Sequence, residues 1–263
     1  MIKVLVNGSG GRMGSEVVRA LAKEQDLVIA GAVDPGCHGK DAGEVADIGH
    51  NGIVISLSLE EALSHETPDV VVDFTSPKVI FDNAKLVLTR GISMVIGTTG
   101  LTEEQRSELG KICQSSGANC LIAPNFSLGA VLLMKVSADI ARYLPDAEII
   151  ELHHNNKLDA PSGTAKLTAE MMAKARTKSP AIDKTTEKLP GVRGGMYKGY
   201  SIHSVRLPGY VAHQEVLFGG YGEILTLRHD SLDRKSFMPG VMLACRKILT
   251  VPGLSYGLET YLD

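Results

Sequence analysis

The chain has few aromatic residues and no large excess of charge of either sign. Only 5% of its 263 residues are aromatic, and none is tryptophan. Single-stranded nucleic acids are bound largely by stacking on aromatic side chains. The net charge of −3, from 27 basic and 30 acidic residues, also lacks the basic excess that is typical of duplex-binding proteins. We therefore expect no nucleic acid partner.

Long apolar runs are also missing, and cysteines are few. No run approaches the roughly 18 apolar residues of a membrane span. The strand-like run 2–6 directly follows Met1, where a secretory signal would need a charged start and a longer apolar stretch. The cysteines, none of which form a C-x-x-C pair, are Cys37, Cys113, Cys120 and Cys245. These absences predict a cytoplasmic protein that has reduced thiols, no disulfide or zinc framework and no membrane partner.

Strands and helices alternate in the first half of the chain. Hydrophobic residues make up 44% of the sequence, enough for a sizeable core. Apolar runs and helical periodicity predict strands at 2–7, 27–33, 69–74, 93–96 and 120–123, and helices at 14–23, 79–89 and 102–114. Strands separated by helices imply βαβ units, so we expect an α/β fold with an N-terminal Rossmann-type, doubly wound parallel sheet.

Strands and helices no longer alternate regularly in the second half of the chain. Apolar runs and helical periodicity there predict helices at 127–143, 164–178 and 236–250 and strands at 147–153, 201–207, 213–219 and 223–229. The last three strands follow one another directly, which favours an α+β domain with a mixed or antiparallel sheet. The segment 176–200 is dense in Lys, Pro and Gly and is the least ordered candidate. We place the domains at 1–125 and 126–234, with 235–263 returning to the first.

A glycine-rich loop joins the first predicted strand to the first helix. Gly8, Gly11 and Gly14 have the spacing G-x-x-G-x-x-G, with Gly10 added, rather than a strict G-x-G-x-x-G. Such a turn allows phosphates to approach the backbone, and the helix N-terminus directs N–H groups at the anion. The loop between strand and helix therefore predicts a dinucleotide pyrophosphate site; the alternative is a glycine-rich turn without a ligand.

An aspartate ends the second predicted strand. Asp34 lies twenty residues beyond Gly14, where an acidic side chain accepts hydrogen bonds from the adenosine ribose. A carboxylate there repels a 2′-phosphate, which favours NADH. His38 and Lys40 could weaken this repulsion, so NADPH remains open, and a simple turn aspartate before Pro35 is the alternative. The segments 74–77, 97–100 and 123–126 each follow a strand and should border the same crevice.

The most informative segment is ELHHNNKLDAPSGTA at 151–165, called here the histidine–lysine segment. Reduction of a C=C or C=N bond needs a hydride on one atom and a proton on its neighbour. His153 suits the proton, because a histidine pKa lies near working pH. Lys157 would hold a carboxylate and stabilise developing negative charge. If the strand persists, His153 and Lys157 share a face and His154 points away.

A helix start follows in the same segment. Ser162 is a plausible N-cap, so Gly163 and Thr164 would present N–H groups that suit a carboxylate. A metal at His153 and His154 ranks low, because neighbouring histidines on a strand diverge and no third ligand is evident. Four further basic side chains either add positive charge around a dianionic substrate or are surface residues or members of interface pairs. They are Arg206, His213, His229 and Arg234.

These motifs together resemble one family, the 4-hydroxy-tetrahydrodipicolinate reductases, long called dihydrodipicolinate reductases, of bacterial lysine and diaminopimelate synthesis. The resemblance covers nearly the whole chain, and the histidine–lysine segment is its most specific part. The other matching motifs are GSGGRMG at 8–14, GKDAGE at 39–44, DFTSP at 73–77, GTTG at 97–100, APNFS at 123–127, SVR at 204–206 and AHQEVLF at 212–218.

The resemblance implies residue roles. His153 would be the proton donor and Lys157 the second catalytic residue, with no metal involved. Contacts to a small dicarboxylate ring substrate would come from His154, Ser162, Gly163, Thr164 and Thr99. Contacts to NADH or NADPH would come from Gly8, Ser9, Gly10, Gly11, Arg12, Met13, Asp34, Phe74, Gly97, Thr98, Thr99, Ala123, Pro124, Asn125 and Phe126.

The family also implies a reaction and an assembly. The hydroxylated ring would lose water and be reduced to tetrahydrodipicolinate, and the enzyme would be a homotetramer whose C-terminal sheets pack together. Family members often have an arginine or lysine where this chain has Ser76, which leaves the cofactor preference open. Two other functions remain: a different two-domain amino-acid or semialdehyde dehydrogenase, which would need a reactive cysteine or another acid–base group, and a non-catalytic nucleotide-binding sensor.

Overall fold

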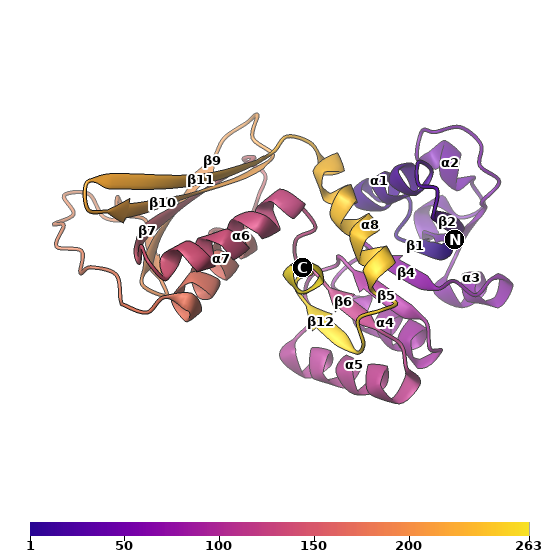
Figure 1. Ribbon diagram of the computed structural model, residues 1–263. Helices are drawn as coiled ribbons and strands as arrows, with labels where there is room; N and C mark the ends of the chain where they lie inside the picture. The colour runs from indigo at the N-terminus through magenta and orange to yellow at the C-terminus, as the bar shows by residue number, and fades with distance from the viewer. Residues whose placement is uncertain (263) are drawn as a thin grey trace. The chain divides into compact units, whose positions relative to one another are not determined.

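A computed structural model of the chain describes residues 1–262. The chain forms two compact units (Figure 1). Unit 1 comprises Met1–Phe126 and the segment from Phe237 onward, and unit 2 comprises Ser127–Ser236. No helix within the described residues is long and apolar enough to cross a bilayer.

Unit 1 is built on a parallel sheet. Within the described residues, the strand order is β12-β6-β5-β4-β1-β2-β3, and each neighbouring pair is parallel. The order reverses between β1 and β4, so the predicted doubly wound sheet is confirmed. The strands are β1 (Ile2–Asn7), β2 (Leu27–Val33), β3 (Ile55–Ser56), β4 (Val70–Asp73), β5 (Ser93–Ile96), β6 (Cys120–Ile122) and β12 (Leu254–Tyr256).

Helices cover the sheet of unit 1. They are α1 (Arg12–Leu21), α2 (Ala42–Val45), α3 (Leu59–His65), α4 (Ile80–Thr89), α5 (Glu103–Ser116) and α8 (Met238–Lys247), with the 3-10 helices η1 (Pro35–Cys37) and η3 (Leu258–Tyr261). On one side, α4 and α5 bury Leu88 and Leu109 against Val71 and Met94 of the central strands. On the other, α8 lies beside α1 (Figure 1). Strands covered on both faces need continuous apolar runs, and Val70–Val72 are fully buried.

Several short elements of unit 1 have no counterpart among the predicted ones. The three-residue β12 pairs parallel to β6, with Leu254 opposite Cys120. The two-residue β3 pairs with β2, with Ile55 opposite Ala32. Neither β3 nor β12 is predicted from an apolar run or from periodicity, and only pairing with the neighbouring strand identifies them.

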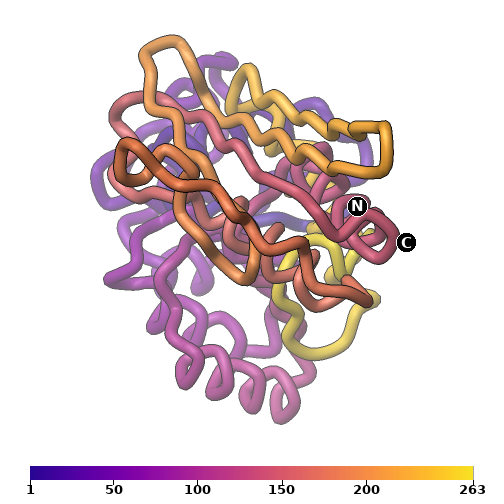
Figure 2. The backbone as a smooth tube through the Cα atoms, turned by 90° about the vertical axis from the view of Figure 1, so that its left-hand side faces the viewer, coloured from indigo at the N-terminus to yellow at the C-terminus, as the bar shows by residue number. Residues whose placement is uncertain are grey.

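Unit 2 contains a mixed sheet, as predicted. Within the described residues its order is β11-β10-β7-β9-β8; β7 and β9 are parallel and the other pairs are antiparallel. The light-orange hairpin in Figure 2 is β10 and β11. The strands are β7 (Asp146–His153), β8 (Gly195–Tyr197), β9 (Tyr200–Arg206), β10 (Ala212–Gly220) and β11 (Glu223–Ser231), and η2 (Arg234–Phe237) follows them.

Two helices, α6 (Leu128–Ala141) and α7 (Gly163–Ala175), pack on one face of this sheet (Figure 1). Side chains alternate between the faces of a strand. On β7, Ile149 and Glu151 are fully buried on the face toward the helices. Glu148 and Ile150 therefore lie on the opposite face. This alternation decides which β7 side chains can reach the start of α7.

The segment between α7 and β8 follows the surface of unit 2. Within the described chain, residues 177–194 form neither helix nor strand. Arg193 bonds both Asp183, with its Nε 3.0 Å from Oδ2, and Glu148 of β7. The segment predicted to be least ordered is thus tied to the sheet by the ion pair of Arg193 with Glu148 rather than by a periodic apolar face.

Candidate active site

The carboxyl ends of β1, β4 and β5 in unit 1 meet at one buried aspartate. Asp73 is 0% exposed. Its Oδ2 accepts hydrogen bonds from Asn7 Nδ2 at 2.7 Å and Asn83 Nδ2 at 3.2 Å. Its Oδ1 accepts from the Thr98 hydroxyl at 2.7 Å and from the hydroxyl and N–H of Thr75 at 2.7 and 3.0 Å. The loops 74–77 and 97–100 are therefore tied together at the topological switch point, where ligands of such sheets bind.

The glycine loop lies at the same edge. Gly8 has a φ of +82°, and a Cβ on Gly14 would lie 1.9 Å from the Gly8 carbonyl oxygen, so the start of α1 approaches the loop too closely for any side chain. Gly11 is the exposed N-cap of α1, which leaves the first-turn N–H groups open to an anion. Ser9 is 1% exposed and directs its hydroxyl to the Val33 carbonyl at 3.3 Å, which anchors the loop to β2.

Asp34 lies directly beside this loop. Its Oδ2 accepts a hydrogen bond from Gly10 N at 3.0 Å, and its Oδ1 accepts one from Gly36 N at 2.9 Å. A Cβ on Gly10 would lie 2.6 Å from Cys37 Sγ. Each carboxylate oxygen can still accept a second hydrogen bond. The loop, the helix N-terminus and Asp34 therefore fit the pyrophosphate and ribose of a dinucleotide.

The three remaining segments predicted to border the cofactor converge in space. The Phe74 and Phe126 rings contact edge to face, with centroids 5.8 Å apart. A Cβ on Gly97 would lie 2.0 Å from the Phe74 ring, so glycine allows this ring to pack against the end of β5. Thr99 and Pro124 are exposed at the same edge.

The histidine–lysine segment begins on β7 in unit 2 and ends at α7. The strand ends at His153, and the chain then turns, with Lys157 N donating to the His154 carbonyl at 3.1 Å. The predicted end of this strand at His153 is confirmed, and a turn follows it, so the strand geometry that would place His153 and Lys157 on one face does not apply. Ser162 is the N-cap of α7, as predicted, and its hydroxyl accepts from Ala165 N at 3.2 Å.

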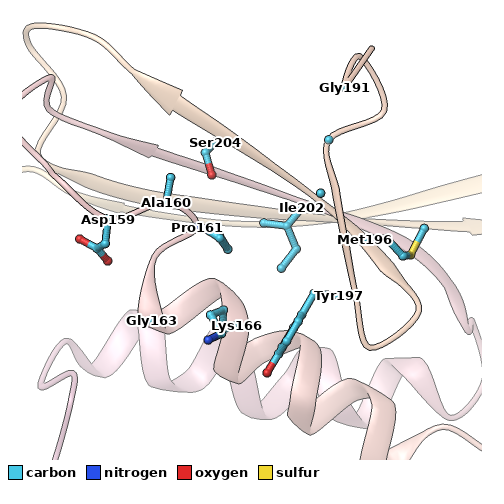
Figure 3. Close-up of a pocket in the computed structure, with 12 residues that line it drawn as sticks. Asp159, Ala160, Pro161, Gly163, Lys166, Gly191, Met196, Tyr197, Ile202 and Ser204 are labelled. Atoms are coloured by element: carbon cyan, nitrogen blue, oxygen red, sulfur yellow. The ribbon is translucent and has the colours of Figure 1, made fainter. Parts of the chain in front are cut away.

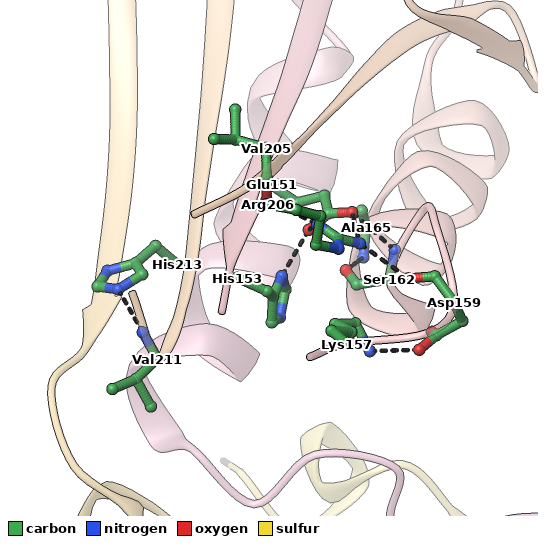
Figure 4. Close-up of polar contacts among 10 residues, drawn as sticks. All are labelled: Glu151, His153, Lys157, Asp159, Ser162, Ala165, Val205, Arg206, Val211 and His213. Atoms are coloured by element: carbon green, nitrogen blue, oxygen red, sulfur yellow. Dashed lines mark hydrogen bonds and ion pairs between the residues drawn. The ribbon is translucent and has the colours of Figure 1, made fainter. Parts of the chain in front are cut away.

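The first residue of this segment, Glu151, has a buried carboxylate that several neighbouring groups contact (Figure 4). Glu151 is 0% exposed, and its Oε2 lies 2.5 Å from His153 Nδ1. Arg206 of β9 donates from Nη1 to Oε2 at 2.8 Å and from Nη2 to Oε1 at 2.7 Å. Ser162 N donates to Oε1 at 3.2 Å. Burial by itself raises the pKa of Glu151, but the hydrogen bonds from His153 and Arg206 outweigh it and lower the pKa to about 2.

Lys157, the predicted cation, pairs with a carboxylate within the segment. Its Nζ lies 2.7 Å from Asp159 Oδ1, and its side chain is 21% exposed. The hydrogen bond from Lys157 is the main cause that lowers the pKa of Asp159. The Asp159 carbonyl also accepts from Arg206 Nη2 at 2.8 Å, so the cation and the buried carboxylate belong to one connected network.

The start of α7 has open space beside its backbone as well as N–H groups. No atom lies within 4 Å of the position that a Cβ on Gly163 would take. First-turn N–H groups lack intrahelical partners, so this open backbone suits a carboxylate. His154 is half-buried one residue beyond His153.

A cavity of about 860 Å³ opens beside the start of α7 (Figure 3). It lies between α7 and the strands β8 and β9, with Lys166 Nζ 5.3 Å from the Tyr197 ring centroid. Gly163 and Asp159 line it, whereas His153 does not. The cavity therefore borders the histidine–lysine segment without containing the predicted proton donor.

Sequence reasoning missed the roles of some residues and left others open. Glu151 was part of the recognised motif but had no predicted role, and Arg206 was one of several unassigned cations. The structure places Arg206 against Glu151. By contrast, His213 Nδ1 bonds Asp230 at 2.7 Å, and His229 Nε2 lies 3.0 Å from the Ser127 hydroxyl. These two histidines serve other parts of the sheet.

Three of the four cysteines, Cys113, Cys120 and Cys245, are buried, and Cys37 is half-buried. Burial raises the pKa of Cys245 to about 12, so this thiol is a poor nucleophile. Among the described residues, no group of three or more His, Cys, Asp or Glu side chains is placed to hold a metal ion.

Family models match both units. The model for the N-terminus of dihydrodipicolinate reductase matches residues 2–126, and the model for its C-terminus matches residues 129–262. A 4-hydroxy-tetrahydrodipicolinate reductase of Listeria innocua is 51% identical over the whole of both chains. One of Moorella thermoacetica is 46% identical over the whole of this chain and 98% of its own.

The chain also resembles solved structures. A dipicolinate-bound dihydrodipicolinate reductase from Paenisporosarcina sp. TG-14 is 41% identical, with a TM-score of 0.87 and complete coverage of both chains. An amine dehydrogenase from Mycobacterium smegmatis has a TM-score of 0.70 at 14% identity, covering 97% of this chain and 94% of its own. The second likeness concerns the fold alone.

Proposed function

The chain belongs to the dihydrodipicolinate reductase family, and we infer that it catalyses the NAD(P)H-dependent reduction of the hydroxylated dicarboxylate ring to tetrahydrodipicolinate. The observation that carries this function is the match of two family models to both units, at 2–126 and 129–262. The family predicted from the sequence is thereby confirmed. The reaction consumes one NAD(P)H and one proton and releases water, and it belongs to diaminopimelate and lysine synthesis.

We propose that unit 1 binds the cofactor. The N-terminus of α1 would hold the pyrophosphate, Asp34 the adenosine ribose, and the loops after β4, β5 and β6 the nicotinamide half. When bound, the reduced nicotinamide supplies the hydride. The Asp34 carboxylate supports a preference for NADH, since it would lie near the 2′-position of the ribose.

Unit 2 would bind the ring and supply the proton. His153 Nδ1 faces Glu151, so its Nε2 is the nitrogen that can give a proton to the substrate. Lys157 would exchange Asp159 for a substrate carboxylate and stabilise negative charge on the reacting ring. The first turn of α7 at Gly163 and Thr164, with His154 beside it, would hold a carboxylate.

We further propose that the enzyme is a cytoplasmic homotetramer. A biosynthetic reaction that draws on NAD(P)H suits that compartment. The face of the unit 2 sheet opposite α6 and α7 supports an assembly through this sheet, because it presents apolar side chains such as Ile224, which is 76% exposed.

The test is an assay of the purified protein with freshly generated hydroxylated ring and either NADH or NADPH. We expect turnover, faster with NADH. His153→Gln should lower kcat by about 10²-fold or more, because one general acid is lost, while NADH binding is retained. His203→Gln, a substitution on the opposite face of the same sheet, is the matched control and should retain activity. A wild-type protein without turnover would refute the function; a His153 variant with near-normal kcat would refute only the residue's role.

A further inference from the structure

We propose that Glu151 is the positioning residue for the proton donor: it fixes which nitrogen of His153 carries the transferable proton. This role rests on the function proposed above. Glu151 and His153 are two residues apart on β7, so both side chains project from the face that α6 and α7 cover. The bond between His153 Nδ1 and Glu151 Oε2, at 2.5 Å, is the contact that carries the argument.

Glu151 cannot move or be replaced by water in this role. It is 0% exposed, and both of its oxygens are held by groups from two other elements. Arg206 of β9 binds both oxygens, at 2.7 and 2.8 Å, and the N-cap residue Ser162 donates its N–H to Oε1 at 3.2 Å. A carboxylate held by a guanidinium and a backbone N–H keeps an imidazole in one orientation, whereas a solvated carboxylate would not.

This arrangement determines how the proton moves. A carboxylate accepts but does not donate, so His153 Nδ1 keeps its hydrogen in both charge states of the ring. The Nε2–H bond breaks when the proton passes to the substrate, and the ring left behind is the neutral Nδ1–H tautomer. Nε2 can then take up a proton from solvent without rotation of the ring. The Arg206 cation balances the Glu151 anion, so the network does not require a charged His153.

The same strand provides a matched control. Glu148 lies three residues before Glu151, on the opposite face of the sheet, and it has the same kinds of partner. Its Oε2 lies 2.7 Å from His203 Nε2, and it also bonds Arg193. A substitution at Glu148 therefore removes an ion-pair network of the same composition, although a more exposed one, from unit 2 without touching the histidine–lysine segment.

The experiment compares Glu151→Gln with Glu148→Gln in the full-length enzyme. We expect Glu151→Gln to lower kcat by about 10- to 100-fold with less than about a twofold change in KM, because proton transfer suffers and binding does not. Glu151→Asp should recover part of the loss. Glu148→Gln should keep kcat within about twofold of the wild type. Equal kinetics for the two glutamine variants would overturn the proposal.

A second measurement does not depend on the variants folding. Nitrogen-15 NMR of the wild-type enzyme, above the pH at which His153 deprotonates, reports the tautomer of its ring. We expect the Nδ1–H form; an Nε2–H form would overturn the proposal. If His153→Gln lowers kcat by about 10²-fold while Glu151→Gln keeps kcat within about twofold of the wild type, this inference fails and the proposed function stands. If the wild type itself does not turn over the ring, the proposed function fails.

Discussion

Gly14 and Gly163 both lie within the first turns of helices, yet their surroundings differ. A Cβ on Gly14 would collide with the Gly8 carbonyl oxygen at 1.9 Å, so the fold itself requires glycine there. A Cβ on Gly163 would meet no atom within 4 Å. Nothing in the fold demands glycine at the start of α7, and the open space is what a ligand carboxylate would use.

We therefore predict that Gly163→Ala weakens substrate binding without lowering the free energy of unfolding. The variant should be as stable as the wild type, or more stable by up to about 1 kcal/mol, because alanine favours a helix. Its KM for the ring should rise by roughly 10-fold, since a methyl group would occupy carboxylate space at a cost of about 1.4 kcal/mol. Thermal unfolding and steady-state kinetics measure the two effects. Gly110→Ala, within α5, is the control and should leave KM unchanged; an unchanged KM for Gly163→Ala would remove Gly163 from the site.

At the scale of elements, β4 is bounded by two aspartates with different functions in the fold. Asp69 precedes the strand, is exposed and accepts a hydrogen bond from Lys3 N at 2.7 Å. Asp73 ends the strand, is fully buried and holds side chains from β1, α4 and two loops. The carboxyl end of β4 is thus organised by one side chain, while its amino end is a simple surface contact.

Asp73→Asn should weaken both the sheet edge and cofactor binding. An amide cannot accept all the hydrogen bonds of a carboxylate, and a buried donor that loses its acceptor costs about 1–3 kcal/mol. We expect the free energy of unfolding to fall by that amount and the Kd for NADH to rise, because the single amide oxygen can no longer anchor both the two asparagine side chains and the two threonines. Chemical denaturation and cofactor fluorescence measure these quantities. Asp69→Asn is the matched control on the same strand; equal effects of both variants would contradict the assignment.

At the scale of the whole molecule, the sheet of unit 2 has helices on one face. Its other face carries two ion-pair networks, Glu148 with His203 and Glu215 with Arg228, at 2.7 and 3.0 Å. Ile224 on β11 is 76% exposed beside them. A sheet face that combines apolar and paired charged side chains suits a partner surface of the same composition, as in a symmetric oligomer.

If the proposed homotetramer assembles through this sheet face, Ile224→Lys should lower the molar mass in solution. A lysine placed in an apolar contact that recurs in each subunit would leave a charge unpaired, which interfaces tolerate poorly. Light scattering on the purified protein measures the change. Tyr143→Lys, at an equally exposed position (84%) beyond the end of α6, is the control and should keep the wild-type mass. A mass unchanged by Ile224→Lys would place the interface elsewhere.

The sequence signal for the proposed site lies in neighbouring residues. The glycines at 8–14, the cap at Ser162 and the pair His153 and Lys157 lie within short segments whose residue order indicates the proposed chemistry. Arg206 binds Glu151 across 55 residues, and Thr98 binds Asp73 across 25. Only strand pairing brings these groups together, because the local sequence does not indicate which distant side chain will form hydrogen bonds with a buried carboxylate.

For the fold, the sequence by itself determined most strands, most helices and the change from parallel to mixed pairing, because apolar periodicity reports which face of an element is buried. Only the tertiary structure decided that β12 joins β6 and that β3 joins β2. These pairings depend on hydrogen bonds to a partner strand that is distant in the sequence. The two residues of β3 have too few side chains to show a period of their own.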